Sequence, residues 1–251
     1  KLKVIGSPST GTDHLDKLYM EKYNIKCFDI SKEFSLINGF TATSELSFGL
    51  LLMLIRKIAI AAAAAKKGLW EREKYTGFQL YRKTFGILGL GRLGKISARI
   101  ANGFGMKVIA HDIINVDYKN VEKVSFKTLI ENSDILTIHI LLNKENEKII
   151  NREVFNKMKK NCILINTSRG KLVDEVALLE ALESKKIQGA ALDLIDGEWN
   201  NNLHEHGLIQ YARENSNLII SPHIGGATVE SINGARIFII NKVADYMKNF
   251  V

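Results

Sequence analysis

The chain has 251 residues, of which 46% are hydrophobic and 25% are charged, and it carries a formal net charge of +8. These proportions are typical of one large or two small folded domains, and they exclude a disordered protein. The lysines are spread along the chain, and the longest charge-free apolar run, residues 46–55, is shorter than the roughly 18 residues of a membrane span, so we expect a cytoplasmic protein that binds neither nucleic acid nor a membrane.

The first third of the chain predicts two strands and two helices. Residues 2–7 and 25–30 are apolar enough for strands, and residues 13–23 predict a short helix between them. Residues 44–68 then predict one long helix, which includes five alanines from Ala61 to Ala65. Cys27 and Cys162 lie in apolar segments far apart, so we expect both in the core and neither in a disulfide or a metal site.

From residue 84 onward, short apolar runs alternate with amphipathic stretches. Strands that are apolar on both faces, each followed by a helix, indicate a parallel sheet covered by helices on both sides. The predicted fold class is therefore α/β, with a doubly wound parallel sheet. The predicted strands are 84–91, 106–112, 134–140, 161–168, 187–195 and 217–224, and the predicted helices are 92–104, 125–133, 151–160, 174–186 and 229–250.

Two long helices bracket this doubly wound region and suggest crossings to a second domain. We expect a nucleotide-binding domain at 47–228 and a discontinuous second domain made of 1–46 and 229–251. The second domain supplies few strands for a core of its own, so we expect it to be partial.

The segment "GILGLGRLG" places Gly89, Gly91 and Gly94 in a GxGxxG spacing between a predicted strand and a predicted helix. Such glycines let backbone amides approach a pyrophosphate at a helix N-terminus, as in Rossmann dinucleotide-binding domains. Asp112 ends the next strand, where a carboxylate accepts hydrogen bonds from ribose hydroxyls and repels a 2′-phosphate. NAD is therefore the expected cofactor in place of NADP; the alternative is that the glycines serve packing alone.

Three polar residues follow predicted strands at the edge of the sheet where ligands bind. Arg169 lies in "ILINTSRGKLVDEVALLEAL", Glu198 in "GAALDLIDGE" and His223 in "SPHIGGAT". With these three motifs and the glycine loop, the chain resembles the D-isomer-specific 2-hydroxyacid dehydrogenases over nearly its whole length. The resemblance implies that the second domain is a flavodoxin-like α/β substrate domain whose N-terminal segment is missing.

The chemistry of a hydroxy acid dehydrogenase assigns a role to each of these three residues. His223 can exchange a proton with the substrate oxygen, because imidazole titrates near neutral pH. Glu198 would fix the tautomer of the imidazole, and Arg169 would bind the substrate carboxylate and carbonyl oxygen. Taken singly, the histidine could be structural, and the arginine could cap a helix or pair with Asp174.

The resemblance also implies further contacts. The loop "SPSTGTDHLD" would hold the substrate carboxylate through Thr10 and Gly11, although it could simply be a turn between strand and helix. Leu141 and Trp199 stand where the family commonly has proline, which leaves the substrate less certain than the chemistry. We expect no metal site, and we interpret His204 and His206 as loop residues. The cofactor contacts implied by the resemblance are His139, Thr167, Asp193, Arg92 and Leu93.

The leading functional hypothesis is an NAD-dependent dehydrogenase or reductase of a small D-2-hydroxy acid or 2-oxo acid. One alternative is an NAD(H)-sensing, corepressor-like binding protein, and another is a formate- or phosphite-type dehydrogenase. The resemblance further implies a homodimer whose contacts include the long helix from about Thr43 and the arm that carries Trp70 and Phe78; Trp70 could instead belong to the core.

Overall fold

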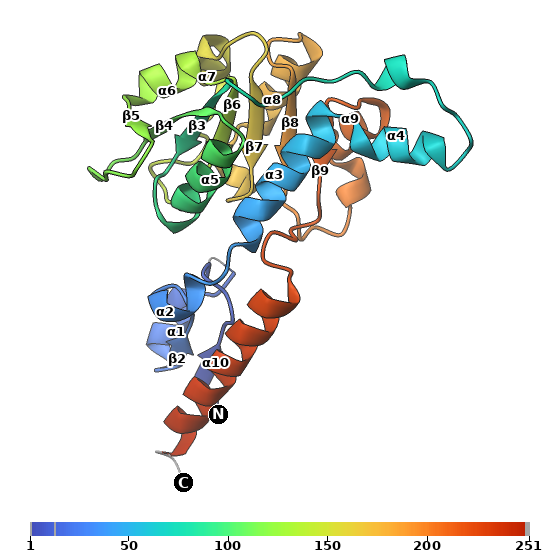
Figure 1. Ribbon diagram of the computed structural model, residues 1–251. Helices are drawn as coiled ribbons and strands as arrows, with labels where there is room; N and C mark the ends of the chain where they lie inside the picture. The colour runs from blue at the N-terminus through green and yellow to red at the C-terminus, as the bar shows by residue number, and fades with distance from the viewer. Residues whose placement is uncertain (1, 13, 249–251) are drawn as a thin grey trace. The chain divides into compact units, whose positions relative to one another are not determined.

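The computed structural model describes residues 2–12 and 14–248, and the chain divides into two compact units (Figure 1). Unit 1 consists of Lys1–Ala42 with Gly226–Val251, and unit 2 consists of Thr43–Gly225. The nucleotide-binding domain expected at 47–228 overlaps unit 2, but unit 2 begins four residues earlier and ends three residues earlier. Residue 13 of the predicted first helix and residues 249–250 of the predicted last helix lie outside the described residues.

Unit 1 is a small α/β unit built around two parallel strands, β1 (Val4–Gly6) and β2 (Lys26–Phe28). The long helix α10 (Val229–Met247) packs on β1 so closely that a Cβ atom at Gly6 would lie 2.5 Å from Ile239. The helix α1 (Lys17–Lys22) was predicted, whereas α2 (Phe34–Ile37) was not. The core of the unit consists of Ile30, Ile37, Ala235 and Ile239.

Unit 2 contains a seven-stranded sheet in the order β5-β4-β3-β6-β7-β8-β9, in which every pair of neighbours is parallel. The chain order reverses between β3 and β6, and the doubly wound parallel sheet that the sequence predicted is confirmed. The strands are β3 (Thr84–Leu88), β4 (Lys107–His111), β5 (Glu122–Lys123), β6 (Ile135–Ile138), β7 (Ile163–Asn166), β8 (Gly189–Leu192) and β9 (Leu218–Ile220).

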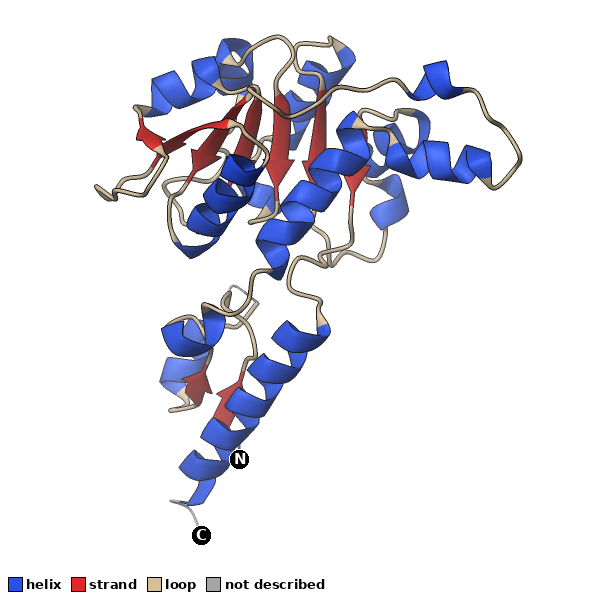
Figure 2. Ribbon diagram, in the orientation of Figure 1, coloured by secondary structure: helices blue, strands red, loops and turns tan. Residues whose placement is uncertain are grey.

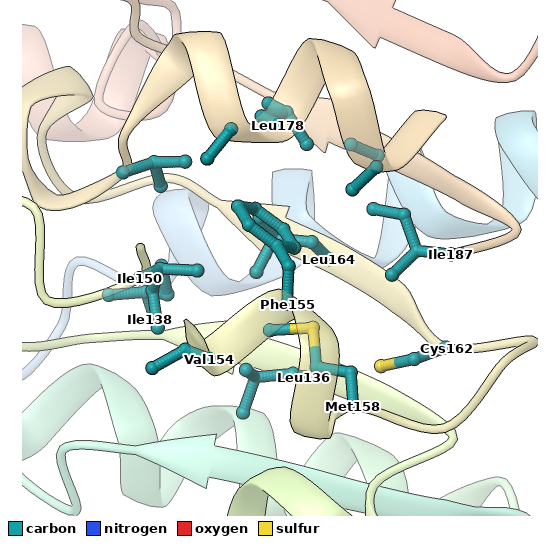
Figure 3. Close-up of a cluster of buried hydrophobic side chains, with 14 of the residues drawn as sticks. Leu136, Ile138, Ile150, Val154, Phe155, Met158, Cys162, Leu164, Leu178 and Ile187 are labelled. Carbon is teal, nitrogen blue, oxygen red and sulfur yellow. The ribbon is translucent and has the colours of Figure 1, made fainter. Parts of the chain in front are cut away.

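Helices cover both faces of this sheet, as Figure 2 shows. Alternate residues of each strand point to opposite faces, so that Leu164 joins one buried cluster while Ile163 and Ile165 join the other. The first cluster is drawn in Figure 3, where Phe155 lies at its centre. This cluster receives α6 (Phe126–Asn132), α7 (Arg152–Lys157), α8 (Glu175–Glu183) and α9 (Gly207–Glu214), and the second receives α3 (Ala42–Ile55) and α5 (Arg92–Gly103).

The single long helix predicted at 44–68 is wrong, because the chain breaks it into α3 and α4 (Ile58–Ala65). Lys57 adopts a left-handed conformation with φ of +52°, which ends α3. The returning chain passes directly over this break, since a Cβ atom at Gly77 would lie 2.0 Å from the carbonyl oxygen of Ile55. Beyond the break, α4 and the segment after it extend away from the sheet (Figure 1).

Residues 34–55 are long and apolar enough to span a membrane by length and composition alone. Buried core helices pass the same test, and α3 is one, since Phe48, Leu51 and Leu54 belong to the core of unit 2. Cys162 is likewise fully buried, as predicted, and burial raises the pKa of its thiol to about 12. Cys27 is only partly buried.

The carboxylate of Asp134 joins three segments at the start of the sheet strands. It accepts hydrogen bonds from the backbone N–H of Thr84 at 2.7 Å and from Lys159 Nζ at 2.9 Å. Burial acts to raise the pKa of Asp134, but these hydrogen bonds and the positive charge of Lys159 outweigh it, so that the pKa is lowered.

We expect Asp134→Asn to lower the free energy of unfolding at neutral pH by about 1–2 kcal/mol, because a charged hydrogen-bond acceptor is lost. A carboxylate whose pKa is lowered on folding stabilises the protein above its unfolded pKa, about 3.9, and that contribution disappears as the pH falls further. The difference in the free energy of unfolding between wild type and Asp134→Asn, measured by urea unfolding, should therefore become smaller as the pH falls below about 3.9. Asp117→Asn is the matched control, because its ion pair with Lys123 is exposed and should contribute less than about 1 kcal/mol.

Candidate active site

The glycine loop between β3 and α5 has the geometry of a phosphate cradle. Gly89 requires glycine because its φ is +97°, and Gly94 requires it because a Cβ atom would lie 2.1 Å from the carbonyl oxygen of Gly89. At Gly91, in contrast, an added Cβ atom would meet no described heavy atom within 4 Å. The loop therefore leaves open space in front of the α5 N-terminus, where an anion can accept hydrogen bonds from backbone N–H groups.

Asp112, directly after β4, is fixed beside this loop. Its Oδ2 accepts a hydrogen bond from the backbone N–H of Leu90 at 2.6 Å, and its Oδ1 accepts one from Ile114 at 2.9 Å. Leu90, His111 and Asp112 line one cavity of about 330 Å³. The carboxylate is thus held at the end of β4, with lone pairs that a ribose hydroxyl can still reach. These residues fit the adenosine half of a dinucleotide.

Three other predicted cofactor residues surround the same loop. His139 follows β6, and its Nε2 lies 2.9 Å from Ser97 Oγ, while its buried Nδ1 has no hydrogen-bond partner among the described residues. Burial lowers the pKa of His139 to about 4, so its imidazole is neutral at physiological pH. Arg92 is the first residue of α5, and burial lowers its pKa; Leu93 follows it.

Arg169 lies on the turn after β7. Ser168 Oγ donates to the carbonyl oxygen of Ile138, and Asn166 Nδ2 donates to the carbonyl oxygen of Arg169, so the turn is tied on both sides. The guanidinium of Arg169 donates to the carbonyl oxygen of Ser168 at 2.7 Å. Gly170 is in contact with the next loop, since a Cβ atom there would lie 2.4 Å from the backbone nitrogen of Asp196.

The histidine loop after β9 is organised by the carboxylate of Asp193, which is 1% exposed. Asp193 accepts hydrogen bonds from Ser221 Oγ at 2.5 Å and from the backbone N–H groups of Ile224 at 2.9 Å and Gly225 at 2.7 Å. Between these anchors His223 adopts a left-handed backbone with φ of +53°. Asp193 was predicted to contact the cofactor; the structure assigns its carboxylate to this loop, and the cofactor contact stays a prediction.

His223 and Glu198 form a hydrogen-bonded pair. Nδ1 of His223 lies 2.9 Å from Oε1 of Glu198, and the two side chains are 37% and 19% exposed. Both line one cavity of about 670 Å³, together with Trp199, whose ring centroid is 6.0 Å from that of His223. The carboxylate fixes a proton on Nδ1 and leaves Nε2 to act on a ligand.

The sequence analysis missed a set of hydroxyl groups at the start of α3. Thr43 Oγ1 donates to the carbonyl oxygen of Gly225 at 3.1 Å, and Ser44 Oγ donates to that of Leu93 at 3.0 Å. Ser47 Oγ lies 2.9 Å from Thr167 Oγ1. One helix therefore joins the histidine loop, the glycine loop and the arginine turn. Three hydroxyls within five residues at the start of a helix that is apolar from Phe48 onward were the available signal.

The structure brings together only part of the predicted site. Glu198 and His223 share a cavity, whereas Arg169 is not among the residues that line it. Thr10 and Gly11 lie in unit 1, on the loop after β1, where the backbone N–H of Gly11 donates to Ser9 Oγ. Within the described part of the chain, no group of three or more His, Cys, Asp or Glu side chains could hold a metal ion.

Residues 48–225 match the family model described as D-isomer specific 2-hydroxyacid dehydrogenase, NAD binding domain. The chain belongs to the D-isomer specific 2-hydroxyacid dehydrogenase family. It is 34% identical over 245 residues to a hydroxypyruvate reductase of Thermotoga maritima, with 96% of this chain and 76% of that protein covered.

Relatives of the chain in this family carry several different names. A D-3-phosphoglycerate dehydrogenase of Bacillus subtilis is 34% identical over 254 residues, covering 98% of this chain but only 46% of that protein. The solved structure of a D-lactate dehydrogenase of Aquifex aeolicus, complexed with NAD and lactic acid, superposes with a TM-score of 0.85 at 29% identity, covering 99% of this chain and 77% of that one. The resemblance to the family is thereby confirmed.

We expect Asp112→Ala to relax discrimination against NADPH by roughly tenfold, which corresponds to about 1.4 kcal/mol. The reason is that the carboxylate would repel a 2′-phosphate. The measurement is the ratio of dissociation constants for NADH and NADPH, taken from quenching of protein fluorescence. Asp112→Asn separates lost charge from lost loop contacts, and an unchanged ratio in both variants would remove Asp112 from this role.

Proposed function

We propose that the protein is an NAD-dependent oxidoreductase that interconverts a small D-2-hydroxy acid and its 2-oxo acid. The observation that carries this proposal is the pairing of His223 Nδ1 with Glu198 Oε1 at 2.9 Å, at the end of the sheet where the glycine loop also lies. An imidazole oriented by a carboxylate is suited to transfer a proton in either direction.

His223 carries the proton chemistry in this proposal. When NAD is bound, its nicotinamide supplies or accepts the hydride at C2 of the substrate. The Nε2 atom of His223 gives a proton to the C2 oxygen during reduction and takes it back during oxidation. Glu198 stabilises the imidazolium that is present before reduction and after oxidation, because the carboxylate is the hydrogen-bond partner of Nδ1.

Arg169 is assigned to the substrate, because a guanidinium offers paired donors to a carboxylate and to the adjacent carbonyl oxygen. Its position on a turn tied to β6 and β7 supports this role. That Thr10 and Gly11 hold a substrate carboxylate through backbone amides stays a prediction. For the cofactor, Gly91 and its neighbours would hold the diphosphate.

The direct test is NADH oxidation by the full-length protein with a panel of 2-oxo acids. The panel contains glyoxylate, pyruvate, hydroxypyruvate, phosphohydroxypyruvate and branched-chain analogues. Turnover of one or a few would support the proposal and name the substrate class. NADH binding without turnover of any 2-oxo acid would contradict the proposal. Oxidation of formate or phosphite would then indicate a dehydrogenase of that type, and no oxidation of either would favour an NAD(H)-sensing binding protein.

We expect His223→Ala to lower kcat by roughly a hundredfold or more, because the proton carrier is lost, while the dissociation constant of NADH stays within about twofold. Stopped-flow turnover and fluorescence titration measure the two quantities. His204→Ala is the matched control, since that side chain is exposed and pairs only loosely with Glu205, at 3.7 Å. If His223→Ala kept wild-type turnover, the histidine would have no part in proton transfer.

We also propose that the protein is a homodimer in which the arm after α4 contacts the second copy. Trp70 is 85% exposed and Leu69 is 50% exposed on a segment that extends from the sheet (Figure 1). Large exposed aromatic side chains of this kind are typical anchors of protein interfaces. Phe78, in contrast, packs partly against the core of unit 2.

Trp70→Glu should weaken this dimer by about 2 kcal/mol or more, as expected for an aromatic anchor. Sedimentation equilibrium of the wild type and the variant measures the dissociation constant. Trp70→Phe keeps an aromatic ring and should retain most of the affinity. A wild-type protein that is monomeric at micromolar concentration would contradict the proposal.

A further inference from the structure

Glu198 lies on a long irregular loop that needs an anchor. The loop runs from Asp196, shortly after β8, to His206, which caps α9. Its first turn is tight, since Gly197 has φ of +73° and accepts a hydrogen bond from the N–H of Asn200 at 2.8 Å. This turn sets the backbone immediately before Glu198. The position of the glutamate relative to His223 therefore depends on what holds the two ends of the loop.

Both ends of this loop meet one carboxylate, that of Glu175 at the start of α8. The backbone N–H of Asp196 donates to Oε1 of Glu175 at 2.8 Å, and Nε2 of His206 lies 3.2 Å from Oε2. The side chains of Glu175 and His206 are only 19% and 20% exposed. One carboxylate thus joins the beginning and the end of the segment that carries Glu198.

The hydrogen bonds of His206 fix its tautomer. The backbone N–H of Leu208 donates to Nδ1 at 3.3 Å, so Nδ1 carries a lone pair and the ring proton is on Nε2. Nε2 then donates towards Glu175 and towards the carbonyl oxygen of Asp196, which is 3.1 Å away. His206 therefore joins Glu175, the first residue of the loop and the N-terminus of α9.

Packing makes this arrangement specific. A Cβ atom at Gly170 would lie 2.3 Å from the carbonyl carbon of Ile195, so the loop begins in direct contact with the arginine turn. Burial raises the pKa of Glu175, although the N–H of Asp196 and the imidazole of His206 lower it. The carboxylate of Glu175 is therefore partly buried at an energetic cost, in a position from which it reaches both ends of the loop.

We propose that Glu175 is a positioning residue, which holds the Asp196–His206 loop so that Glu198 meets the imidazole of His223. The inference rests on the proposed function for its kinetic consequence. Glu175 acts through Glu198 and has no contact with the reacting atoms. Its removal should therefore leave cofactor binding intact and affect the step in which the proton moves.

The kinetic test is a double-mutant cycle with the 2-oxo acid that the wild type reduces. Glu175→Ala should lower kcat by roughly ten- to a hundredfold with the KM for NADH within about twofold, as expected when a reacting group is displaced. Glu175→Gln should lower it less, because the amide oxygen still accepts the N–H of Asp196. Once Glu198→Gln is present, Glu175→Ala should have little further effect, since the two act through one interaction. Glu183→Ala, exposed on the last turn of the same helix, is the control.

Two kinetic results would overturn the proposal: an undiminished kcat in Glu175→Ala, or the same fold-loss with and without Glu198→Gln. A second measurement does not depend on turnover. In a Trp70→Phe background, Trp199 is the one remaining tryptophan and reports on the loop. Glu175→Ala should increase the fast component of its fluorescence anisotropy decay, and Glu183→Ala should not. If the wild type reduced no substrate, the proposed function would fail, and an unchanged decay would then overturn the loop assignment separately.

Discussion

The candidate active site depends on one buried carboxylate, that of Asp193. A turn that places a histidine in the left-handed region leaves backbone N–H groups pointing inward, and buried N–H groups without acceptors are strongly unfavourable. Asp193 accepts two of them and the hydroxyl of Ser221 as well. The acid that directly follows β8 therefore shapes the loop after β9. Its three hydrogen bonds offset the loss of hydration of a carboxylate that is 1% exposed.

A second constraint connects the loops to one another. Loops at the carboxyl end of a parallel sheet follow different strands, and backbone hydrogen bonds between strands do not fix how such loops sit together. The hydroxyls of Thr43, Ser44 and Ser47 do so, because each reaches a different loop from the same end of α3. Since α3 is also buried in the core of unit 2, the loops are tied to the hydrophobic core of that unit.

The sequence predicts those features that leave a local pattern. Strand residues such as 163–165 are buried on both faces and are therefore continuously apolar, which made the central strands predictable. β5 has only two residues, Glu122 and Lys123, both exposed, so no pattern distinguishes it from a loop. The break at Lys57 could not be predicted for another reason. It lies in contact with the returning chain at Gly77, twenty residues later, and no local pattern reports such a contact.

The candidate site divides in the same way. The pair of His223 and Glu198 was predicted because each lies in a recognisable motif, and the structure brings the two side chains together. The role of His206 was not predicted, because its partner Glu175 lies 31 positions earlier in the sequence and no local pattern indicates the contact. Polar side chains that bind backbone groups across the fold are visible only once the fold is known.

Leu141 and Trp199, which stand where the family commonly has proline, take no part in these hydrogen bonds between loops. Leu141 is 84% exposed and Trp199 is 80% exposed, so neither side chain supports the sheet or its loops. Trp199 nevertheless lies 6.0 Å from the imidazole of His223, next to the glutamate that orients it. Under the proposed function, a change at Trp199 alters which molecules reach Nε2 without disturbing the hydrogen bonds that position it. Hydrogen bonds to buried groups position the residues that would carry the chemistry. Trp199, which would select the substrate, is exposed, so a substitution there would remove no buried contact of the sheet.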